Sequence, residues 1–308
     1  MLKVCIIGCG AVGSLFAAHL AQKGEVEVWA YDVWKDHIDA IRSNGLHLSG
    51  AADFTAKLHA TSDAKELPRC DYGIVATKAI HTRSAIAQAA HAFDYGSAVC
   101  SVQNGIGNEE ILAEQVKTVI RGTTFPAGHP IAPGHIGFDI KGDTWIGPFE
   151  PTNTPMSKVE ELAGLITRSG MNTIPLKDAR GAQWTKLIFN AATNPVGALT
   201  LLHHGAATRF APTGQLFNDL ITEGEDVAKA LGIELHGDPR ALVKKGATAP
   251  GKHRASMLQD VLAKRETEVD FMNGAIVKSG EQAAVSTPLN RAVWELIKGL
   301  QHSWSDPD

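Results

Sequence analysis

Lys186, Asn190 and Asn194 are the strongest group of candidate functional residues in the second half of the chain. They are spaced by four residues, so they share one face of a helix. The segment 184–189 is otherwise largely apolar, which predicts that this helix is mostly buried. A desolvated lysine loses its proton more readily than an exposed one, and this suits a general acid. The alternative is a lysine that reaches solvent, with asparagines capping the helix before Pro195.

Ser256 and Glu268 are two further polar candidates. Ser256 begins a predicted helix over 256–278, and a serine at a helix N-terminus suits carboxylate binding. Glu268 is expected on the same helix, a little over three turns later. The alternatives are a capping box formed by Ser256 and Gln259, and a solvated surface glutamate at position 268.

Residues 2–13 join a short apolar run to three regularly spaced glycines. The apolar run suits a buried strand. In this pattern the first glycine permits a tight turn, the second lets phosphates approach bare backbone, and the third packs the next helix on the strand. The N-terminus of that helix attracts anions. A glycine-rich turn that binds nothing is the alternative. The pattern assigns a dinucleotide site to Gly8, Gly10, Ala11, Val12 and Gly13.

Asp32 ends the second predicted strand, 26–32. It follows the first glycine by slightly more than the roughly 20 residues typical of an acid that binds the adenosine ribose. A carboxylate there accepts hydrogen bonds from a ribose diol and repels a 2′-phosphate, so it favours NADH over NADPH. In the alternatives, Asp32 caps the helix that starts near Trp34, and Lys35 or Arg42 binds a phosphate.

Lys78 and Asn104 follow two predicted core strands, 71–77 and 98–103. In open parallel sheets, ligands bind outside the carboxyl ends of the strands. Both residues are therefore candidates for cofactor binding, and Asn104 also for substrate binding. The alternatives are a solvated strand terminus at Lys78 and an Asn–Gly turn at Asn104.

The elements that position these residues change character along the chain. Residues 1–176 alternate strand and helix signals, which predicts a doubly wound, parallel Rossmann sheet and a dinucleotide-binding domain. The segments 134–139 and 143–146 are expected to extend that sheet in antiparallel fashion. Residues 177–308 show helical periodicity and predict an all-α domain that closes the crevice and supplies substrate chemistry. Its helices are expected at 179–193, 213–231, 238–245, 256–278 and 288–301.

Composition narrows the function classes. The 308 residues carry a formal net charge of −4, which favours neither nucleic acid nor an anionic membrane as a partner. No apolar run reaches the ~18 residues that span a bilayer, and the chain starts directly with a strand instead of a signal peptide. The cysteines form no CxxC pair, which predicts reduced thiols in a cytoplasmic protein. His203 and His204 lack a suitably spaced third ligand, so no metal site is predicted.

Taken together, these motifs resemble the ketopantoate reductase (2-dehydropantoate 2-reductase) family over nearly the whole chain. The segments that match in order are 8–13, 78–79, 103–105, 184–195, 256–260 and 267–274. The resemblance implies a Rossmann domain followed by a helical substrate and dimerisation domain, as in 6-phosphogluconate-dehydrogenase-like folds. It also implies a homodimer that uses NAD(P)H, usually NADPH, to reduce the 2-oxo group of ketopantoate to (R)-pantoate.

The resemblance also implies roles for the candidate residues. Lys186 would be the general acid that protonates the carbonyl oxygen, and a cation there stabilises the developing alkoxide. Glu268 would assist this step and hold the distal hydroxyl of the substrate. Ser256 would bind the substrate carboxylate, and Asn190 and Asn194 would orient the substrate and the lysine. Asn104 would sit beside the nicotinamide and Lys186.

Two positions depart from the family pattern. Asp32 stands where members that use NADPH commonly carry arginine, which favours NADH. His253 stands where the family has a substrate-binding asparagine, so this wall of the expected substrate pocket differs. These departures keep two alternatives open. One is an NAD-dependent D-2-hydroxy-acid (mandelate-like) dehydrogenase acting on another branched or aromatic 2-oxo acid, and the other is a non-catalytic dinucleotide sensor.

Overall fold

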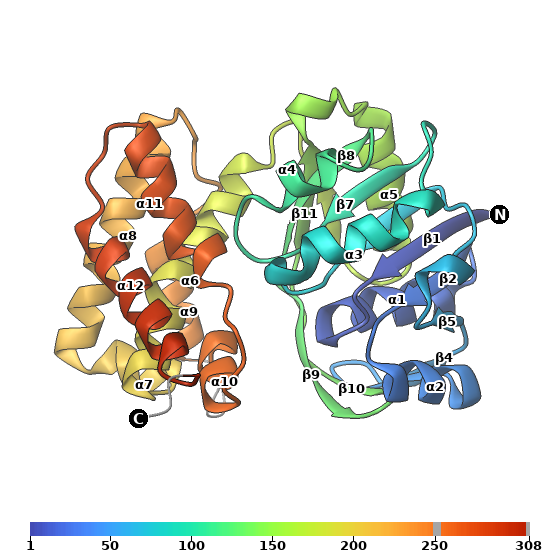
Figure 1. Ribbon diagram of the computed structural model, residues 1–308, viewed down its shortest axis with the longest axis horizontal. Helices are drawn as coiled ribbons and strands as arrows, with labels where there is room; N and C mark the ends of the chain where they lie inside the picture. The colour runs from blue at the N-terminus through green and yellow to red at the C-terminus, as the bar shows by residue number, and fades with distance from the viewer. Residues whose placement is uncertain (249–253, 306–308) are drawn as a thin grey trace. The chain divides into compact units, whose positions relative to one another are not determined.

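A computed structural model describes residues 1–248 and 254–305, which form two compact units (Figure 1). Met1–Gln103 and Asn108–Ala179 form the first, here called the sheet unit. Asn104–Gly107 and the chain from Arg180 onward form the second, here called the helical unit. The division into a dinucleotide domain, 1–176, and a substrate and dimerisation domain, 177–308, stays a prediction about function.

The main sheet of the sheet unit confirms the doubly wound architecture. All neighbouring strands are parallel except β11 and β8, and β1 lies between β6 and β2, where the strand order reverses. Such a reversal opens a crevice at the carboxyl end of β1. The order of the strands is β12 (Thr173–Pro175), β11 (Thr144–Pro148), β8 (Val119–Thr124), β7 (Ala98–Ser101), β6 (Tyr72–Val75), β1 (Leu2–Ile7), β2 (Val26–Tyr31) and β5 (His59–Thr61).

Helices cover both faces of this sheet, and the period-two alternation of β1 divides its side chains between them. Val4 and Ile6 belong to the core on one face, whereas Cys5 and Ile7 belong to the core on the other. The first core is covered by α1 (Ala11–Lys23) and α5 (Met156–Arg168). The second is covered by α3 (Thr82–Ala89) and α4 (Asn108–Ala113), which Figure 1 shows in front of the sheet.

A smaller sheet corrects the prediction that 134–139 extends the main sheet. Only β11 does so, whereas β10 pairs in parallel with β3. The physical reason is burial, because Ile136 and Phe138 of β10 and Leu48 of β3 pack into the core beside α1. The elements of this region are α2 (Lys35–Asn44) and the strands in the order β4 (Phe54–Ala56), β3 (Leu46–Gly50), β10 (His135–Ile140) and β9 (Ala127–Ala132).

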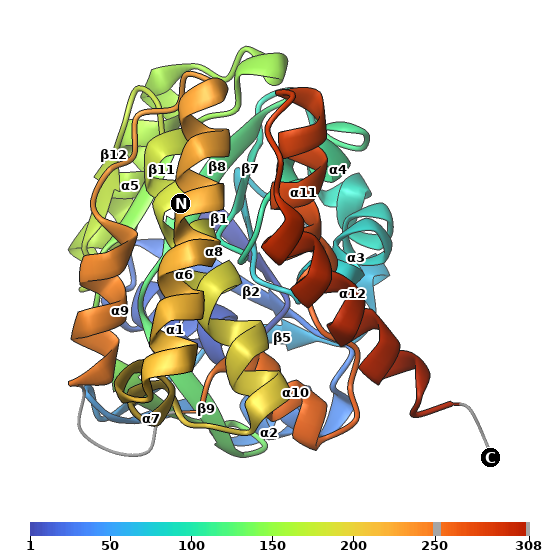
Figure 2. The same ribbon diagram turned by 90° about the vertical axis from the view of Figure 1, so that its left-hand side faces the viewer.

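The helical unit is built around α6, which packs against α7, α8, α9, α10 and α12 (Figure 2). Its core joins apolar residues of α6 to those of the surrounding helices. The helices are α6 (Arg180–Thr200), α7 (His204–Arg209), α8 (Ala211–Ala230), α9 (Pro239–Ala247), α10 (Ser256–Leu262), α11 (Asn273–Gln282) and α12 (Pro288–His302). Short 3-10 helices complete the described elements: η1 (Ala64–Glu66), η2 (Ala79–His81), η3 (Ala90–Ala92), η4 (Glu150–Thr152) and η5 (Val269–Phe271).

The long helix predicted over 256–278 is wrong. Helix α10 ends at Leu262, Lys264 adopts a left-handed φ of 49°, and α11 begins only at Asn273. Thr267 holds the intervening segment, since its N–H and Oγ1 both donate to Gln301 Oε1, at 3.0 and 2.5 Å. These long-range bonds override the helical periodicity of the segment.

Two of the alternatives considered for helix ends are also wrong. Helix α6 continues through Pro195 to Thr200, so Asn190 and Asn194 do not cap its end. The capping box is absent from α10 as described, because its N-cap residue is Ala255, with no side-chain bond, and Gln259 Nε2 donates to the carbonyl of Arg254 at 3.0 Å. Within the described part of the chain, no helix is both long and apolar enough to cross a bilayer.

Candidate active site

Glycine stands at each of the three positions of the first turn for a different steric reason. Gly8 adopts a left-handed φ of 88°, and a Cβ there would lie 2.5 Å from Thr77 N. A Cβ on Gly13 would lie 1.9 Å from the carbonyl oxygen of Gly8, so only glycine permits this approach of helix to turn. A Cβ on Gly10, by contrast, would meet no atom of residues 1–248 or 254–305 within 4 Å. Gly10 thus faces the open space that a ligand's phosphates need.

Helix α1 presents its N-terminus to that space. Gly10 is its N-cap residue, and no side chain of the described residues caps it. Ala11 and Val12 form its first turn together with Gly13. Amide N–H groups at an uncapped helix N-terminus attract anions. The arrangement fits the pyrophosphate of a dinucleotide.

Alanine substitutions at Gly10 and Gly13 should have different effects, the first on dinucleotide affinity and the second on stability. Gly10→Ala adds a methyl group into open space, so the Tm should stay within about 2 °C of the parent while the Kd for NADH or NADPH rises at least about tenfold. Gly13→Ala should lower stability by about 1–3 kcal/mol, because its methyl group overlaps the Gly8 carbonyl. Calorimetry and dinucleotide titration measure both effects, with Gly299→Ala, also open, as the control. Unchanged affinity in Gly10→Ala would count against a phosphate site at this turn.

Asp32 lies directly after β2 and is half-buried. Its Oδ1 accepts a hydrogen bond from the N–H of Trp34 at 2.8 Å, and Trp34 is the N-cap residue of α2. The carboxylate thus orients the start of α2. This contact is similar to the helix-capping role that was the alternative for Asp32. Arg42 is held elsewhere, since its guanidinium bonds Glu66 at 2.8 Å and the Ala60 carbonyl at 2.6 Å.

Lys78 follows the carboxyl end of β6 and is half-buried, at the N-cap position of η2. Strand β6 is the direct neighbour of β1, whose carboxyl end leads into the glycine turn. The sheet topology therefore brings Lys78, Asp32 and the glycine turn to the carboxyl edge of neighbouring strands.

Lys186 lies on α6 in the helical unit, and its environment changes its acidity. Burial lowers the pKa of Lys186 from 10.5 to about 8, and the negative charge of Glu268 opposes this shift. Glu268 itself is 7% exposed. The two residues thus interact electrostatically, although Glu268 stands just before η5 and not on the helix that Ser256 begins. A lysine whose pKa lies near neutral pH exchanges its proton readily.

Two asparagines lie on the same helix as Lys186, as the spacing by four predicts. Asn190 and Asn194 are both buried on α6. The Nδ2 of Asn190 donates to Asn104 Oδ1 at 3.5 Å, and that of Asn194 donates to Met272 Sδ at 3.7 Å. The helical unit therefore gathers Asn104, Asn190, Asn194, Lys186 and Glu268.

The segment Asn104–Gly107 packs with the helical unit through contacts that sequence reasoning missed. Gly105 has a left-handed φ of 83°, and residues 104–107 form a bend. The Nε2 of Gln183 donates to the Gly105 carbonyl at 3.4 Å, and Ile106 N–H donates to the Phe271 carbonyl at 3.1 Å. Gln183 precedes Lys186 by about one helical turn, and this spacing could have identified Gln183 as a candidate residue.

The remaining residues considered from the sequence are Ser256, His253, His203 and His204. Ser256 is exposed at the start of α10. The residue before it, Ala255, lies near Gly197 of α6, since a Cβ on Gly197 would be 3.9 Å from the Cβ of Ala255. His253 lies outside the described residues. His204 shares a hydrogen bond of 2.9 Å with the Val243 carbonyl, and His203 is the N-cap residue of α7. Among the residues that the structure describes, no group of three or more His, Cys, Asp or Glu could hold a metal ion.

The sheet order and glycine turn define a Rossmann-type dinucleotide fold joined to a helical domain. The family model described as ketopantoate reductase PanE/ApbA matches residues 4–151, and the model of the C-terminal part of the same family matches residues 178–301. The chain therefore belongs to the ketopantoate reductase family, as the motifs implied.

Individual relatives agree with this assignment. A 2-dehydropantoate 2-reductase of Archaeoglobus fulgidus is 32% identical over 303 residues, covering 97% of this chain and 98% of the relative. The crystal structure of a PanE/ApbA family ketopantoate reductase from Ralstonia eutropha is similar with a TM-score of 0.88 at 29% identity, over 99% of this chain and 100% of that one. A D-mandelate dehydrogenase with NADH and anilino(oxo)acetate has a TM-score of 0.89 at 25% identity, over 98% and 99% of the two chains.

Proposed function

We propose that the protein is an NAD(P)H-dependent reductase of a 2-oxo acid, with 2-dehydropantoate as substrate and (R)-pantoate as product. The observation that carries the proposal is the electrostatic pairing of the buried Glu268 with Lys186, which lies on a helix that also bears Asn190 and Asn194. The membership of the family and the curated 2-dehydropantoate 2-reductases among the relatives support the choice of substrate.

The residues of the sheet unit fit a dinucleotide. The bare backbone at Gly10 and the N-terminus of α1 suit a pyrophosphate, and Asp32 suits a ribose diol. Lys78 offers a cation at the same edge of the sheet. A nicotinamide dinucleotide held by these residues would supply the hydride for the substrate's carbonyl carbon.

The residues of the helical unit perform the proton chemistry. Lys186 Nζ donates a proton to the carbonyl oxygen, which would otherwise carry the charge of an alkoxide. Glu268 keeps this lysine protonated at neutral pH, because its charge raises the pKa of Lys186 against the effect of burial. Asn104, Asn190 and Asn194 present amides that orient the substrate, and Ser256 and His253 complete the proposed substrate contacts.

A substrate screen tests this function directly. Steady-state rates would be measured with ketopantoate, 2-oxoisovalerate and phenylglyoxylate, each with NADH and with NADPH. The proposal expects the highest kcat/KM with ketopantoate. A much slower turnover of ketopantoate than of the other two acids would overturn it.

A second candidate function is an NAD-linked D-2-hydroxy-acid dehydrogenase. The likeness to D-mandelate dehydrogenase and the acidic residue at position 32 favour it. In the same screen, preference for phenylglyoxylate with NADH supports this candidate. Dinucleotide binding without turnover of any acid would instead support a non-catalytic sensor.

Asp32 is proposed to select NADH. Replacing Asp32 with arginine should shift the ratio of kcat/KM for NADPH over NADH upward by about 10- to 100-fold, because a carboxylate that repels the 2′-phosphate is exchanged for a cation that binds it. Asp36→Arg changes the same charge on the exposed first turn of α2 and is the matched control. An unchanged ratio in Asp32→Arg argues against the ribose role.

We also infer that the protein is a cytoplasmic homodimer, as the family resemblance implies. The cysteines are all free and buried, which suits a reducing compartment. Light scattering on the purified protein measures its mass in solution, and a monomer at micromolar concentration contradicts the dimer.

A further inference from the structure

His37 is a fully buried histidine that none of the proposed catalytic or binding steps uses. It lies in the first turn of α2, five residues after Asp32. Burial lowers the pKa of His37 below 6.5, whereas the Asp32 carboxylate and the Cys9 carbonyl oppose this shift. The imidazole is therefore neutral at neutral pH.

The hydrogen bonds of His37 define its tautomer. The N–H of Gly134 donates to Nδ1 at 2.9 Å, so Nδ1 carries a lone pair and the ring proton is on Nε2. Nε2 lies 3.4 Å from the hydroxyl oxygen of Ser14, which can accept that proton's hydrogen bond. The Ser14 hydroxyl in turn donates to the carbonyl of Cys9 at 2.9 Å. A continuous relay thus runs from Gly134 through His37 and Ser14 to Cys9.

This relay ends inside the glycine turn. Cys9 lies between Gly8 and Gly10, and Ser14 directly follows Gly13. The indole of Trp34 stacks on the imidazole with ring centroids 4.6 Å apart, and the N–H of Trp34 bonds Asp32. His37 therefore contacts the supports of both the proposed phosphate turn and the proposed ribose carboxylate.

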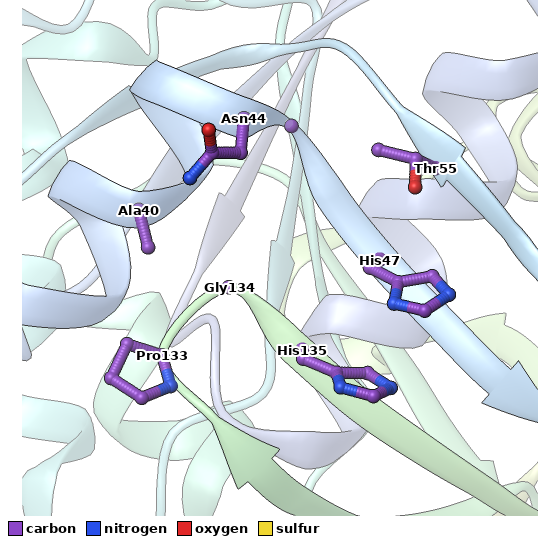
Figure 3. A pocket seen from close by; sticks show the side chains of 8 residues that line it. Ala40, Asn44, His47, Thr55, Pro133, Gly134 and His135 are labelled. Atoms are coloured by element: carbon purple, nitrogen blue, oxygen red, sulfur yellow. The ribbon is translucent and has the colours of Figure 1, made fainter.

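The other end of the relay is fixed to the smaller sheet. Gly134 forms the turn between β9 and β10 with a φ of 73°, and its carbonyl accepts from His47 N–H at 2.8 Å. A Cβ on Gly134 would lie 3.0 Å from that of Ala40 on α2. Figure 3 shows this turn opposite Ala40, with His135 and His47 side by side, around a hollow of about 290 Å³. The turn that donates to His37 thus lies against α2 and is hydrogen-bonded to β3.

We propose that His37 is a positioning residue for the dinucleotide, which holds the glycine turn through Ser14 and the start of α2 through Trp34. The inference rests on the proposed dinucleotide-binding function of the sheet unit. Hydrogen-bonded supports of this kind hold binding groups in a productive geometry. Their loss changes ligand affinity more than the rate of the chemical step.

Protonation of Nδ1 would break the relay, because two N–H groups would then face each other at Gly134. The groups that face the imidazole are the Ser14 hydroxyl on α1, the Cys9 thiol and carbonyl, the Asp32 carboxylate and the backbone of Gly134. Burial raises the pKa of the Cys9 thiol to about 12, so it stays neutral. A neutral side chain in place of His37 would not create that repulsion. Dinucleotide affinity is thus expected to fall as the pH drops through the pKa of His37, which burial lowers below its ordinary 6.5.

Two substitutions separate the two ends of the relay. His37→Asn places an amide oxygen near Nδ1 and keeps the acceptor for Gly134, but it loses the donor to Ser14. His37→Gln places an amide nitrogen near Nε2 and keeps that donor. The Kd for NADH, from titration of protein fluorescence, should rise about three- to tenfold in His37→Asn and less than about twofold in His37→Gln. At saturating NADH, kcat should change less than about twofold in both.

Ser14→Ala provides a second, independent variant. It should raise the Kd for NADH as His37→Asn does, and the double variant should add nothing further, because both changes break one relay. The affinity of His37→Gln should also lose the decline at acidic pH. His91→Asn, at an exposed position, is the control for the substitution itself.

The outcomes separate this inference from the proposed function. Wild-type affinity in His37→Asn and Ser14→Ala, additive effects in the double variant, or equal losses in the two His37 variants would overturn the positioning role. If the parent protein binds NADH but reduces no 2-oxo acid, the proposed reaction is overturned. The Kd values of the His37 and Ser14 variants then still test the positioning role of His37. A parent protein that binds neither dinucleotide overturns both.

Discussion

Replacing Lys186 with alanine is expected to lower kcat for 2-oxo-acid reduction by about 10²- to 10⁴-fold, the usual contribution of a positioned general acid. The variant loses the group whose pKa is lowered to about 8, and alanine offers no proton in its place. The Kd for NADH or NADPH should change less than about threefold, because Lys186 has no proposed part in holding the dinucleotide. Stopped-flow measurement of nicotinamide oxidation and equilibrium titration give the two quantities.

Two further variants test whether the loss of proton donation causes this effect. Lys186→Arg keeps the positive charge but stays protonated at all working pH values, so it should also lose at least about 100-fold in kcat if proton donation is the role. Lys244→Ala removes an exposed lysine of α9 and should behave as the parent. A Lys186→Ala enzyme within tenfold of the parent kcat would refute the general-acid assignment.

Replacing Glu268 with glutamine is expected to move the alkaline limb of the pH–rate profile to lower pH. The carboxylate raises the pKa of Lys186, so its removal lowers that pKa further below 8. Reduction needs the protonated lysine, and activity is therefore lost as the pH rises through this lower value. At pH 8 the loss in kcat/KM should be at least about tenfold, since the variant lysine is mostly neutral there.

The pH profile of kcat/KM between pH 6 and 10 measures this shift. Glu266→Gln, at an exposed position two residues away, is the matched control and should keep the profile of the parent. If Glu268→Gln lowers activity by the same factor at every pH, the carboxylate acts on the substrate alone and not on the acidity of Lys186.

The glycine turn was predictable in detail because its constraints are local. A Cβ on Gly13 would meet the carbonyl of Gly8 five residues earlier, so this steric limit acts over a few residues, whereas the limit at Gly8 also involves the distant Thr77. The same holds for the stripe on α6, since the spacing of four places Lys186 and Asn190 on one face. What each of these residues does in catalysis stays a prediction.

Glu268 shows where local reasoning failed. The periodicity of 256–278 suggested a single helix, but Thr267 is held by Gln301, a residue of the final helix. Glu268 still lies near Lys186, for reasons of long-range packing and not of helical spacing. The smaller sheet failed similarly, because the partner of β10 is β3, far away in the sequence.

The amino-acid sequence alone determined the dinucleotide turn, the parallel sheet and the buried lysine helix, since glycine sterics and the periods of strands and helices act between near neighbours. Only the tertiary structure decided that β3 pairs with β10, that Asn104 packs against Asn190, and that His37 joins Gly134 to Ser14. Each of these contacts joins surfaces from distant segments. Such pairings are chosen by which apolar faces bury each other, and no local pattern contains that information.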